Sequence, residues 1–157
     1  MKVKHIFSYE MGSVYRQKGD VPNMISSYLD CLSYLPSRLT NIQAFFQREL
    51  SAGDGFNELM KQLMQRLAKT PENTVYAELV IWIYTQQKDF ENALVHARAL
   101  DLRLGENGSR IFRLARTAFN EKDYDATIAS YSYLIDEKGT ACPYYVDAKE
   151  GLSLIHI

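Results

Sequence analysis

The residues of this sequence that are able to carry acid–base, nucleophilic or metal chemistry are few and lie far apart. Histidine and cysteine occur only as His5, His96, His156, Cys31 and Cys142. None of them stands at the spacing of a metal-ligand pair, and the motifs of zinc proteases, α/β-hydrolases and phosphate-binding loops are missing. We therefore expect a chain that is not an enzyme and that holds neither a metal nor a cofactor.

His96 and Cys31 fall inside expected helices, where each has a plain structural interpretation. His96 stands beside Ala97, and a partly exposed helix position accounts for it. Cys31 and Cys142 are too far apart in the sequence to suggest a disulfide framework. We expect two free thiols, with Cys31 in the core.

A second set of residues combines large aromatic side chains with arginines. Aromatic rings anchor protein partners, and the guanidinium group of arginine pairs with carboxylates. By helical geometry these residues lie on the exposed side of several expected helices. The candidate partner-binding residues are Tyr9, Phe45, Arg48, Glu78, Trp82, Arg113, Arg116 and Phe119. The alternative is that Phe45 and Trp82 pack between repeats and that the arginines form a solvated surface.

Three arginines recur at every third position in one expected helix. Arg110, Arg113 and Arg116 therefore share one side of that helix. This spacing leads to the hypothesis that they receive an acidic tail. Truncation of Trp82 separates the two interpretations of that residue, because a core tryptophan costs roughly 3–5 kcal/mol when it is replaced by alanine.

These positions belong to a sequence repeat. When the stretch from 73 to 137 is shifted by 34 residues, Asp89 falls on Asp123, Phe90 on Tyr124 and others follow in register. A fixed period of this length is typical of stacked helix pairs. The expected repeats are 5–38, 40–73, 74–107 and 108–141, with a partial fifth at 142–151. The second repeat is displaced by 35 residues, which places one extra residue near 36–40.

The first repeat illustrates how each helix pair is punctuated. We expect helices at 5–18 and 21–35, with Gly19 ending the first and Asp20 capping the second. Pro22 falls in the first helical turn, where its missing N–H is harmless, and Pro36 ends the pair. In the second repeat, residues 51–55 form the break. In the third repeat, either Asn73 or Thr74 is expected to cap the first helix.

The repeats resemble the tetratricopeptide family across residues 5–141. The residues that carry this resemblance are Gly12, Tyr15, Gly19, Asp20, Tyr28 and Pro36, then Tyr84, Asp89, Phe90, Ala93 and Ala97, then Ala115, Asp123, Tyr124 and Tyr131. Gln47 and Ile81 depart from the pattern, because the family has small residues there. The resemblance implies an all-α superhelix, or solenoid, of antiparallel helix pairs whose first helices line a concave groove. It also implies a non-catalytic scaffold that binds a peptide or a protein in that groove.

Charge and composition separate this interpretation from its alternatives. The chain has 18 Lys and Arg against 19 Asp and Glu, a net charge of −1. RNA-binding helical repeats are usually basic, so we expect no nucleic-acid partner, and an RNA-binding repeat remains only a remote alternative. A further alternative is the docking arm of a larger enzyme or sensor whose catalytic domain lies outside this sequence.

The ends of the sequence carry two further expectations. There is no apolar run of about 18 residues and no signal-peptide pattern at the start, so we expect no membrane insertion and take the cytoplasm as the default compartment. Residues 152–157 resemble the translated end of a sequencing adapter. We therefore expect a non-native tail on a fragment of a longer protein, and we exclude that tail from the fold.

Overall fold

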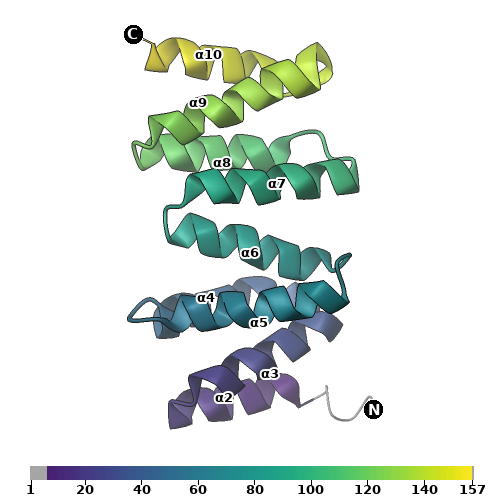
Figure 1. Ribbon diagram of the computed structural model, residues 1–157, viewed down its shortest axis with the longest axis vertical. Coiled ribbons are helices and arrows are strands. Elements are labelled where there is room, and N and C mark those ends of the chain that lie inside the picture. Colours follow the sequence, from purple (N-terminus) through teal and green to yellow (C-terminus); the bar gives the residue numbers. More distant parts are fainter. Residues whose placement is uncertain (1–6, 157) are drawn as a thin grey trace. The chain divides into compact units, whose positions relative to one another are not determined.

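The computed structural model describes residues 7–156, in which nine α-helices and no strand occur (Figure 1). The chain divides into two compact units, Met1–Leu79 and Val80–Ile157. The first unit contains α2 (Ser8–Lys18), α3 (Val21–Tyr34), the 3-10 turn η1 (Pro36–Arg38), α4 (Leu39–Leu50) and α5 (Gly55–Lys69). Helix α6 (Thr74–Gln86) contributes residues to both units. The second unit contains α7 (Phe90–Leu104), α8 (Ser109–Asn120), α9 (Tyr124–Tyr133), the π-helical turn η2 (Leu134–Lys138), the 3-10 turn η3 (Gly139–Ala141) and α10 (Tyr145–Ile155).

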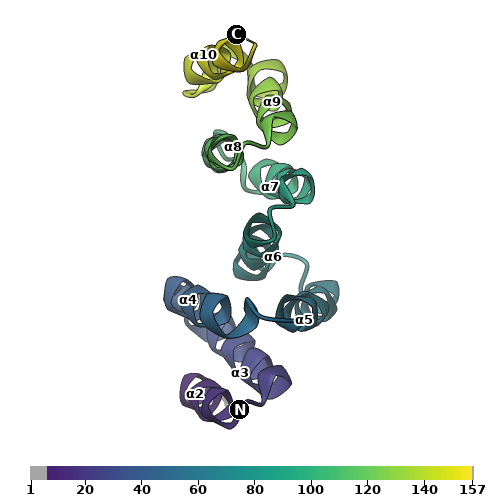
Figure 2. The same cartoon turned by 90° about the vertical axis from the view of Figure 1, so that its left-hand side faces the viewer.

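The prediction of an all-α chain in which neighbouring helices pack is confirmed. In the first unit α2 packs on α3, and in the second α8 packs on both α7 and α9, as Figure 2 shows for the second unit. The predicted helix at 21–35 agrees with α3 to within one residue. Of the predicted helix at 5–18, residues 5–6 lie outside the described part, and Phe7 precedes α2 as its N-cap. The single repeat domain at 5–151 stays a prediction, as does the non-native tail, although α10 continues to Ile155.

The turn between α2 and α3 follows the predicted punctuation. Gly19 is left-handed, with φ 72°, and ends α2. The N–H of Asp20 donates to the Tyr15 carbonyl at 3.0 Å, which satisfies one of the carbonyls left open at a helix end. The Asp20 carboxylate then caps α3, because it accepts from the backbone N–H of Asn23 at 3.3 Å and from that residue's side-chain amide at 2.8 Å.

The same turn recurs twice in the second unit. Asp89 and Asp123 cap α7 and α9, and each accepts the N–H of the residue three positions later, at 3.2 Å and 3.0 Å. Each aspartate also donates its own N–H to the carbonyl five residues earlier, at 2.9 Å in both cases. The preceding residues, Lys88 and Lys122, adopt the left-handed conformation of Gly19, with φ 59° and 65°. The same hydrogen bonds thus recur in three turns of the structure. This recurrence does not depend on the apolar residues that the repeats share.

The turn before α5 differs from these three. Gly55 stands where the others have aspartate, and α5 begins at that residue. The Asp54 side chain accepts no backbone N–H there. Its carboxylate accepts a hydrogen bond from the side-chain amide of Asn57 at 3.4 Å. A Cβ on Gly55 would lie 2.8 Å from a methyl carbon of Leu50, so the close approach of the chain leaves no room for an aspartate at this position.

Small residues let the helices of a pair approach closely. A Cβ at Gly12 of α2 would lie 2.5–2.9 Å from three ring atoms of Tyr28 in α3. In the second unit the corresponding residues are Ala115 of α8, fully buried, and Tyr131 of α9. These two pairs, α2 with α3 and α8 with α9, are packed more extensively than α4 with α5, where Gln47 replaces the small residue. The departure of Gln47 from the family pattern is therefore accompanied by less extensive packing of α4 on α5.

Two polar networks join helices, one of them partly buried and the other centred on a fully buried aspartate. In the first unit the Arg66 guanidinium donates to Asp30 at 2.6 Å and to Ser26, and Tyr76 donates to the Leu29 carbonyl at 2.8 Å. Burial tends to lower the pKa of Arg66, but its hydrogen bonds to Asp30 and Tyr76 raise it, and the net direction is upward. The side chain therefore stays charged and pins α5 to α3.

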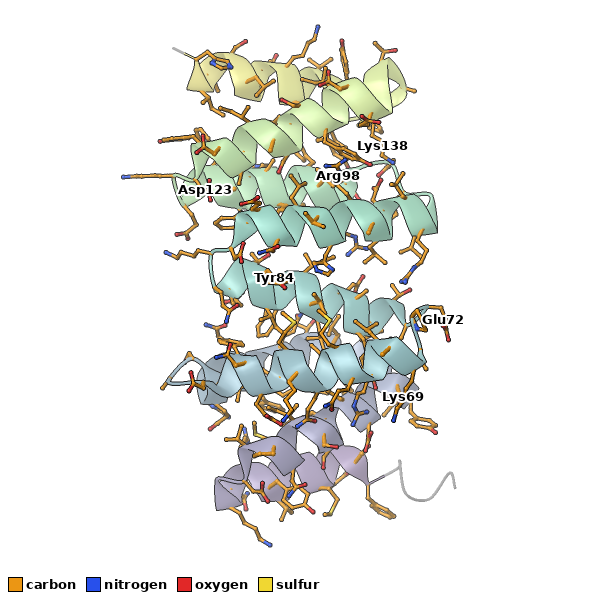
Figure 3. All side chains as sticks on the ribbon, viewed as in Figure 1. Lys69, Glu72, Tyr84, Arg98, Asp123 and Lys138 are labelled. Carbon is orange, nitrogen blue, oxygen red and sulfur yellow. The ribbon has the colours of Figure 1, made fainter. Side chains whose placement is uncertain are left out.

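In the second unit the fully buried Asp101 holds the turn after α7. Its carboxylate accepts the N–H of Gly108 at 2.9 Å and forms an ion pair with Lys138. Lys138 also donates to the Glu106 carbonyl at 3.0 Å. Lys138 lies at one end of the α9–η2 segment and Asp123 at the other (Figure 3). The sequence did not predict η2, because its residues continue the apolar spacing of α9.

Candidate protein-binding face

Three aromatic rings from three helices of the first unit form one cluster. Tyr28 of α3 stacks on Phe45 of α4, with ring centroids 5.5 Å apart and an interplanar angle of 26°. Tyr9 of α2 lies 5.9 Å from the Tyr28 ring and 6.2 Å from the Phe45 ring. Tyr28 is fully buried, whereas Tyr9 and Phe45 are half-buried. The cluster thus has a buried floor and two rings that reach the surface.

Three arginines surround these rings. The guanidinium carbon of Arg16 lies 4.6 Å from the Phe45 centroid, and that of Arg48 lies 5.7 Å from the same ring. The guanidinium carbon of Arg38 lies 4.8 Å from the Tyr9 centroid. Cations over an aromatic face are attracted by its negative electrostatic potential. We call Tyr9, Phe45, Arg16, Arg38 and Arg48 the aromatic–arginine face.

The carboxylates near this face are few. Arg48 pairs with its neighbour Glu49 at 3.0 Å, but its side chain is 63% exposed, so solvent screens that pair. Within residues 7–156, neither Arg16 nor Arg38 forms an ion pair with a carboxylate. The face therefore carries an excess of positive charge next to exposed ring surface.

The floor of the face is neutral. Burial raises the pKa of the Tyr28 phenol, and the Ser13 hydroxyl at 3.3 Å and the charge of Arg16 lower it by less. The hydroxyl therefore remains protonated at neutral pH and shares a hydrogen bond with Ser13. Tyr28 holds Phe45 in place from beneath, and it adds no charge that would compete with an incoming anion.

The structure brings together three of the predicted partner-binding residues and leaves the others elsewhere. Tyr9, Phe45 and Arg48 lie in the aromatic–arginine face. Glu78 is half-buried in the part of α6 that belongs to the first unit, and Trp82 is half-buried in the part that belongs to the second. The degree of burial of Trp82 lies between the core and the exposed interpretations, so its role stays a prediction.

The remaining predicted residues lie on α8. Arg113 and Arg116 are exposed. Phe119 is 40% exposed and meets Tyr124 edge to face, with centroids 5.9 Å apart. Arg110, by contrast, forms two hydrogen bonds with Glu106, at 2.8 Å and 3.1 Å, with its side chain only 15% exposed. The proposed row of three arginines therefore reduces to two that present their charge to solvent.

A related aromatic cluster occurs in the second unit. Phe112 of α8 lies 6.2 Å from Tyr131 of α9, which matches the Tyr9–Tyr28 pair in position within the repeat. Tyr144 stacks on Phe112 at 4.7 Å. The two clusters share a ring pair, and Arg16, Arg38 and Arg48 lie over the rings of the first.

Outside these clusters, the clefts described for residues 7–156 include one between α3 and α5 and one between α7 and α9, and neither suggests a reaction. One, between α3 and α5, is polar and contains Arg66, whose guanidinium is already held by Asp30, Ser26 and Tyr76. The other, between α7 and α9, is acidic and contains Asp123, which serves as the cap of α9. In both clefts, the charged group named here already has a structural role in joining or capping helices.

The histidines and cysteines do not assemble into a site within the described chain. Residues 7–156 contain no cluster of three or more His, Cys, Asp or Glu that is arranged to hold a metal. Cys31 and Cys142 are buried free thiols, and burial raises the pKa of the Cys31 thiol. His96 stacks on Tyr84, with centroids 5.4 Å apart, and is partly exposed as predicted. In the same part of the chain no helix has the length and apolar character needed to span a bilayer.

Arg16 and Arg38 are the members of the face that the sequence did not predict. Arg16 lies seven residues after Tyr9, which places both on one side of α2, so spacing alone would have found it. Arg38 lies in η1, at the extra residues between the first two helix pairs, and no pattern relates it to Tyr9.

Comparison of the chain with protein-family models, curated proteins and solved structures finds no match.

Proposed function

We propose that the chain is a non-catalytic protein-interaction scaffold of the tetratricopeptide type, built from antiparallel helix pairs. The 34-residue period and the three matching turns at Asp20, Asp89 and Asp123 support this assignment. The close approach of Gly12 to Tyr28 supports it as well, since small residues allow helices to pair tightly. In such arrays each helix pair is a structural module, and the exposed side chains supply specificity.

The aromatic–arginine face carries the functional proposal. Its partner is an acidic peptide that also offers an apolar side chain. Two of the three guanidinium groups, those of Arg16 and Arg38, lie over rings and lack a carboxylate partner in the described chain. A guanidinium that stacks on a ring still presents its N–H edges, and those edges bind carboxylates through paired hydrogen bonds. The exposed edges of Tyr9 and Phe45 then receive the apolar side chain.

Selection from a random peptide library displayed on phage tests this function. Peptides selected on the wild-type chain are expected to contain several carboxylates and at least one large apolar residue. The dissociation constant of a selected peptide is then measured by fluorescence anisotropy. Phe45→Ala and Arg38→Glu are each expected to weaken binding about tenfold or more, because they remove an anchor or reverse a charge. Higher salt is expected to weaken binding too.

The matched control is Lys61→Glu, which makes the same change of charge on an exposed lysine of α5, away from the face. This variant is expected to bind as the wild type does. Circular dichroism checks that each variant keeps its helical content. Failure to enrich any peptide, or binding that ignores both face substitutions, would reject the proposed function.

A further inference from the structure

The turn between α7 and α8 contains Asn107–Gly108, the single asparagine–glycine pair of the sequence. The side chain of Asn107 is exposed, whereas Gly108 is buried. An asparagine in this setting is chemically reactive, because the backbone nitrogen of the following residue is able to attack its side-chain amide. Glycine offers the least resistance to that attack, since it has no Cβ. The pair is therefore a candidate site of spontaneous modification.

The reaction at this site is deamidation. The Gly108 nitrogen loses its proton and forms a bond to Cγ of Asn107, while the bond from Cγ to Nδ2 breaks and ammonia leaves. Water then opens the cyclic imide at either carbonyl. One product has aspartate at this position, and the other has isoaspartate, in which the backbone runs through the side-chain carbon. Water is the only co-reactant, and no group is oxidised or reduced.

Both residues of the pair have a structural role in the turn. Gly108 is left-handed, with φ 90°, and a Cβ there would lie 2.6 Å from a methyl carbon of Leu134. The Asn107 side chain accepts the N–H of Ser109, the first residue of α8, at 3.2 Å. The turn thus uses a reactive pair for structural reasons.

The peptide group that joins the two residues is held at both ends. Its N–H, from Gly108, donates to the buried Asp101 carboxylate at 2.9 Å. Its carbonyl, from Asn107, accepts from the Cys142 thiol at 3.4 Å. Asp101 is in turn held by its ion pair with Lys138. Rotation of this peptide group therefore breaks two hydrogen bonds to two different segments of the second unit.

The direction of the Gly108 N–H bond decides whether the nitrogen can react. When an amide nitrogen loses its proton, the freed electron pair lies along the former N–H bond. At Gly108 that direction leads to the Asp101 carboxylate and not to Cγ of Asn107. The nitrogen can attack only after the peptide group has rotated. We propose that Asn107 is a deamidation site and that the folded turn slows the reaction there through Asp101 and Cys142. The site lies in the second unit, and its chemistry does not rest on the proposed binding of a partner.

Deamidation in turn changes this part of the fold. Isoaspartate adds a carbon to the backbone, which displaces the Gly108 N–H from Asp101 and leaves a buried carboxylate oxygen without its donor. Either product also adds a negative charge next to Glu106 in the sequence. The modification, once formed, therefore destabilises the turn that restrained it.

Incubation of the purified chain at mildly alkaline pH and physiological temperature tests the proposal. Trypsin cuts after Arg103 and Arg110, so residues 104–110 form one peptide that contains Asn107. Mass spectrometry separates the amide from the acid, and chromatography separates aspartate from isoaspartate. A synthetic peptide of residues 104–110 gives the rate without the fold. The folded chain is expected to react about tenfold or more slowly than this peptide, since a hydrogen bond to a charged group contributes about that factor.

Three variants test the named residues. Asp101→Ala removes the acceptor of the Gly108 N–H and is expected to speed deamidation about tenfold or more. Cys142→Ala removes the donor to the Asn107 carbonyl and is expected to speed it by a smaller factor, because a thiol is a weak donor. Asn107→Ser is expected to abolish the product, since it removes the reacting amide.

Leu94→Ala is the matched control for a general loss of stability. Leu94 is 6% exposed in α7 and lies about two helical turns before Asp101, so its truncation destabilises the second unit without removing either hydrogen bond of the turn. The variants are compared at urea concentrations that make them equally stable. At equal stability, Asp101→Ala is still expected to deamidate about tenfold or more faster than Leu94→Ala. If circular dichroism shows that Asp101→Ala does not fold, Cys142→Ala takes its place in this comparison and is expected to deamidate faster than Leu94→Ala.

Three outcomes would overturn the inference. The first is a folded chain that deamidates as fast as the synthetic peptide. The second is an equal rate for the turn variant and Leu94→Ala at equal stability, which would mean that the reaction proceeds only through unfolding of the whole unit. The third is a slower reaction in Asp101→Ala, which would mean that the carboxylate promotes the attack by accepting the Gly108 proton as a general base.

Discussion

Asp101 and Lys138 form a buried ion pair that joins the end of α7 to the π-helical turn after α9. Asp101 is fully buried, and the side chain of Lys138 is 18% exposed. The hydrogen bond with Asp101 raises the pKa of Lys138, so the ammonium remains charged throughout the physiological range. Within residues 7–79 the ion pair of Arg66 with Asp30 joins α5 to α3 instead, and its two side chains are 25% and 40% exposed.

Removal of one partner should be more damaging than removal of both. Lys138→Met is expected to cost about 3–5 kcal/mol of unfolding free energy, because it leaves the buried Asp101 carboxylate without its counter-charge. The double variant Lys138→Met with Asp101→Asn is expected to recover part of that loss. Urea denaturation measures both. Lys88→Met, which removes the exposed pair with Glu121, is the control and should change stability by no more than about 1 kcal/mol.

The close approach of α2 and α3 predicts an unusual effect of a small substitution. Alanine favours a helix over glycine by about 1 kcal/mol, yet Gly12→Ala is expected to destabilise the chain by about 1 kcal/mol or more, since its Cβ overlaps the Tyr28 ring. Thermal and urea unfolding give the measured change. A Tyr28→Leu background should remove the penalty. A gain in stability from Gly12→Ala alone would mean that the pair has room to spare.

Tyr76→Phe isolates one hydrogen-bonded group in the first unit. The Tyr76 hydroxyl donates to the Leu29 carbonyl and accepts from Arg66 at 3.2 Å, at a residue that is 3% exposed. Its loss removes two hydrogen bonds, one of them from a charged guanidinium, which is expected to cost about 1–3 kcal/mol. The test is chemical denaturation beside Tyr124→Phe, at a residue that is 46% exposed, where little change is expected.

Lys122 adopts a left-handed conformation that is costly for a residue with a side chain. Lys122→Gly is therefore expected to stabilise the chain by about 0.5–1 kcal/mol, despite the added freedom of glycine in the unfolded state. Lys61→Gly, inside α5, should instead destabilise by about 1 kcal/mol. The two melting temperatures should thus move in opposite directions. A loss of stability at both positions would contradict the assigned conformation of Lys122.

His96 predicts how stability depends on pH. Burial lowers the pKa of its imidazole below the ordinary 6.5, so the folded chain resists protonation there. Well above pH 6.5 the ring is neutral in both states and contributes no pH dependence. As the pH falls below 6.5, the unfolded chain binds a proton first, and stability decreases until the folded pKa is passed. Urea unfolding between pH 5 and pH 8 should show this slope. His96→Gln should flatten it, whereas an equal slope in both proteins would exclude His96 as its source.

Local sequence patterns predicted the helix ends well. Asp20 is a cap, Gly19 is left-handed and Asn73 accepts the N–H of Tyr76 at 3.1 Å, which decides between Asn73 and Thr74. These features depend on residues within a few positions of one another. The π-helical turn η2 was not predictable, because its residues continue the apolar spacing of α9 and its ion pair joins Lys138 to Asp101, which is 37 residues earlier in the sequence.

The candidate face was predicted in part for the same reason. Tyr9, Phe45 and Arg48 share the expected exposed side of first helices, and helical spacing identifies them. Arg38 joins the face only through the path of η1, which the sequence does not encode as a pattern. Tyr28 was expected to pack in the pair, but its stacking on Phe45 depends on how α4 follows α3.

The recurrent turns also bear on how fast the chain folds. Each turn at Asp20, Asp89 and Asp123 closes through hydrogen bonds between residues at most five positions apart. Bringing such neighbours together requires little loop-closure entropy, in contrast to strands paired across a whole domain. Chains dominated by contacts of this range reach their folded state within microseconds to milliseconds. In each unit a helix pair can therefore form early at its own turn, and the neighbouring helices can add to it from either side.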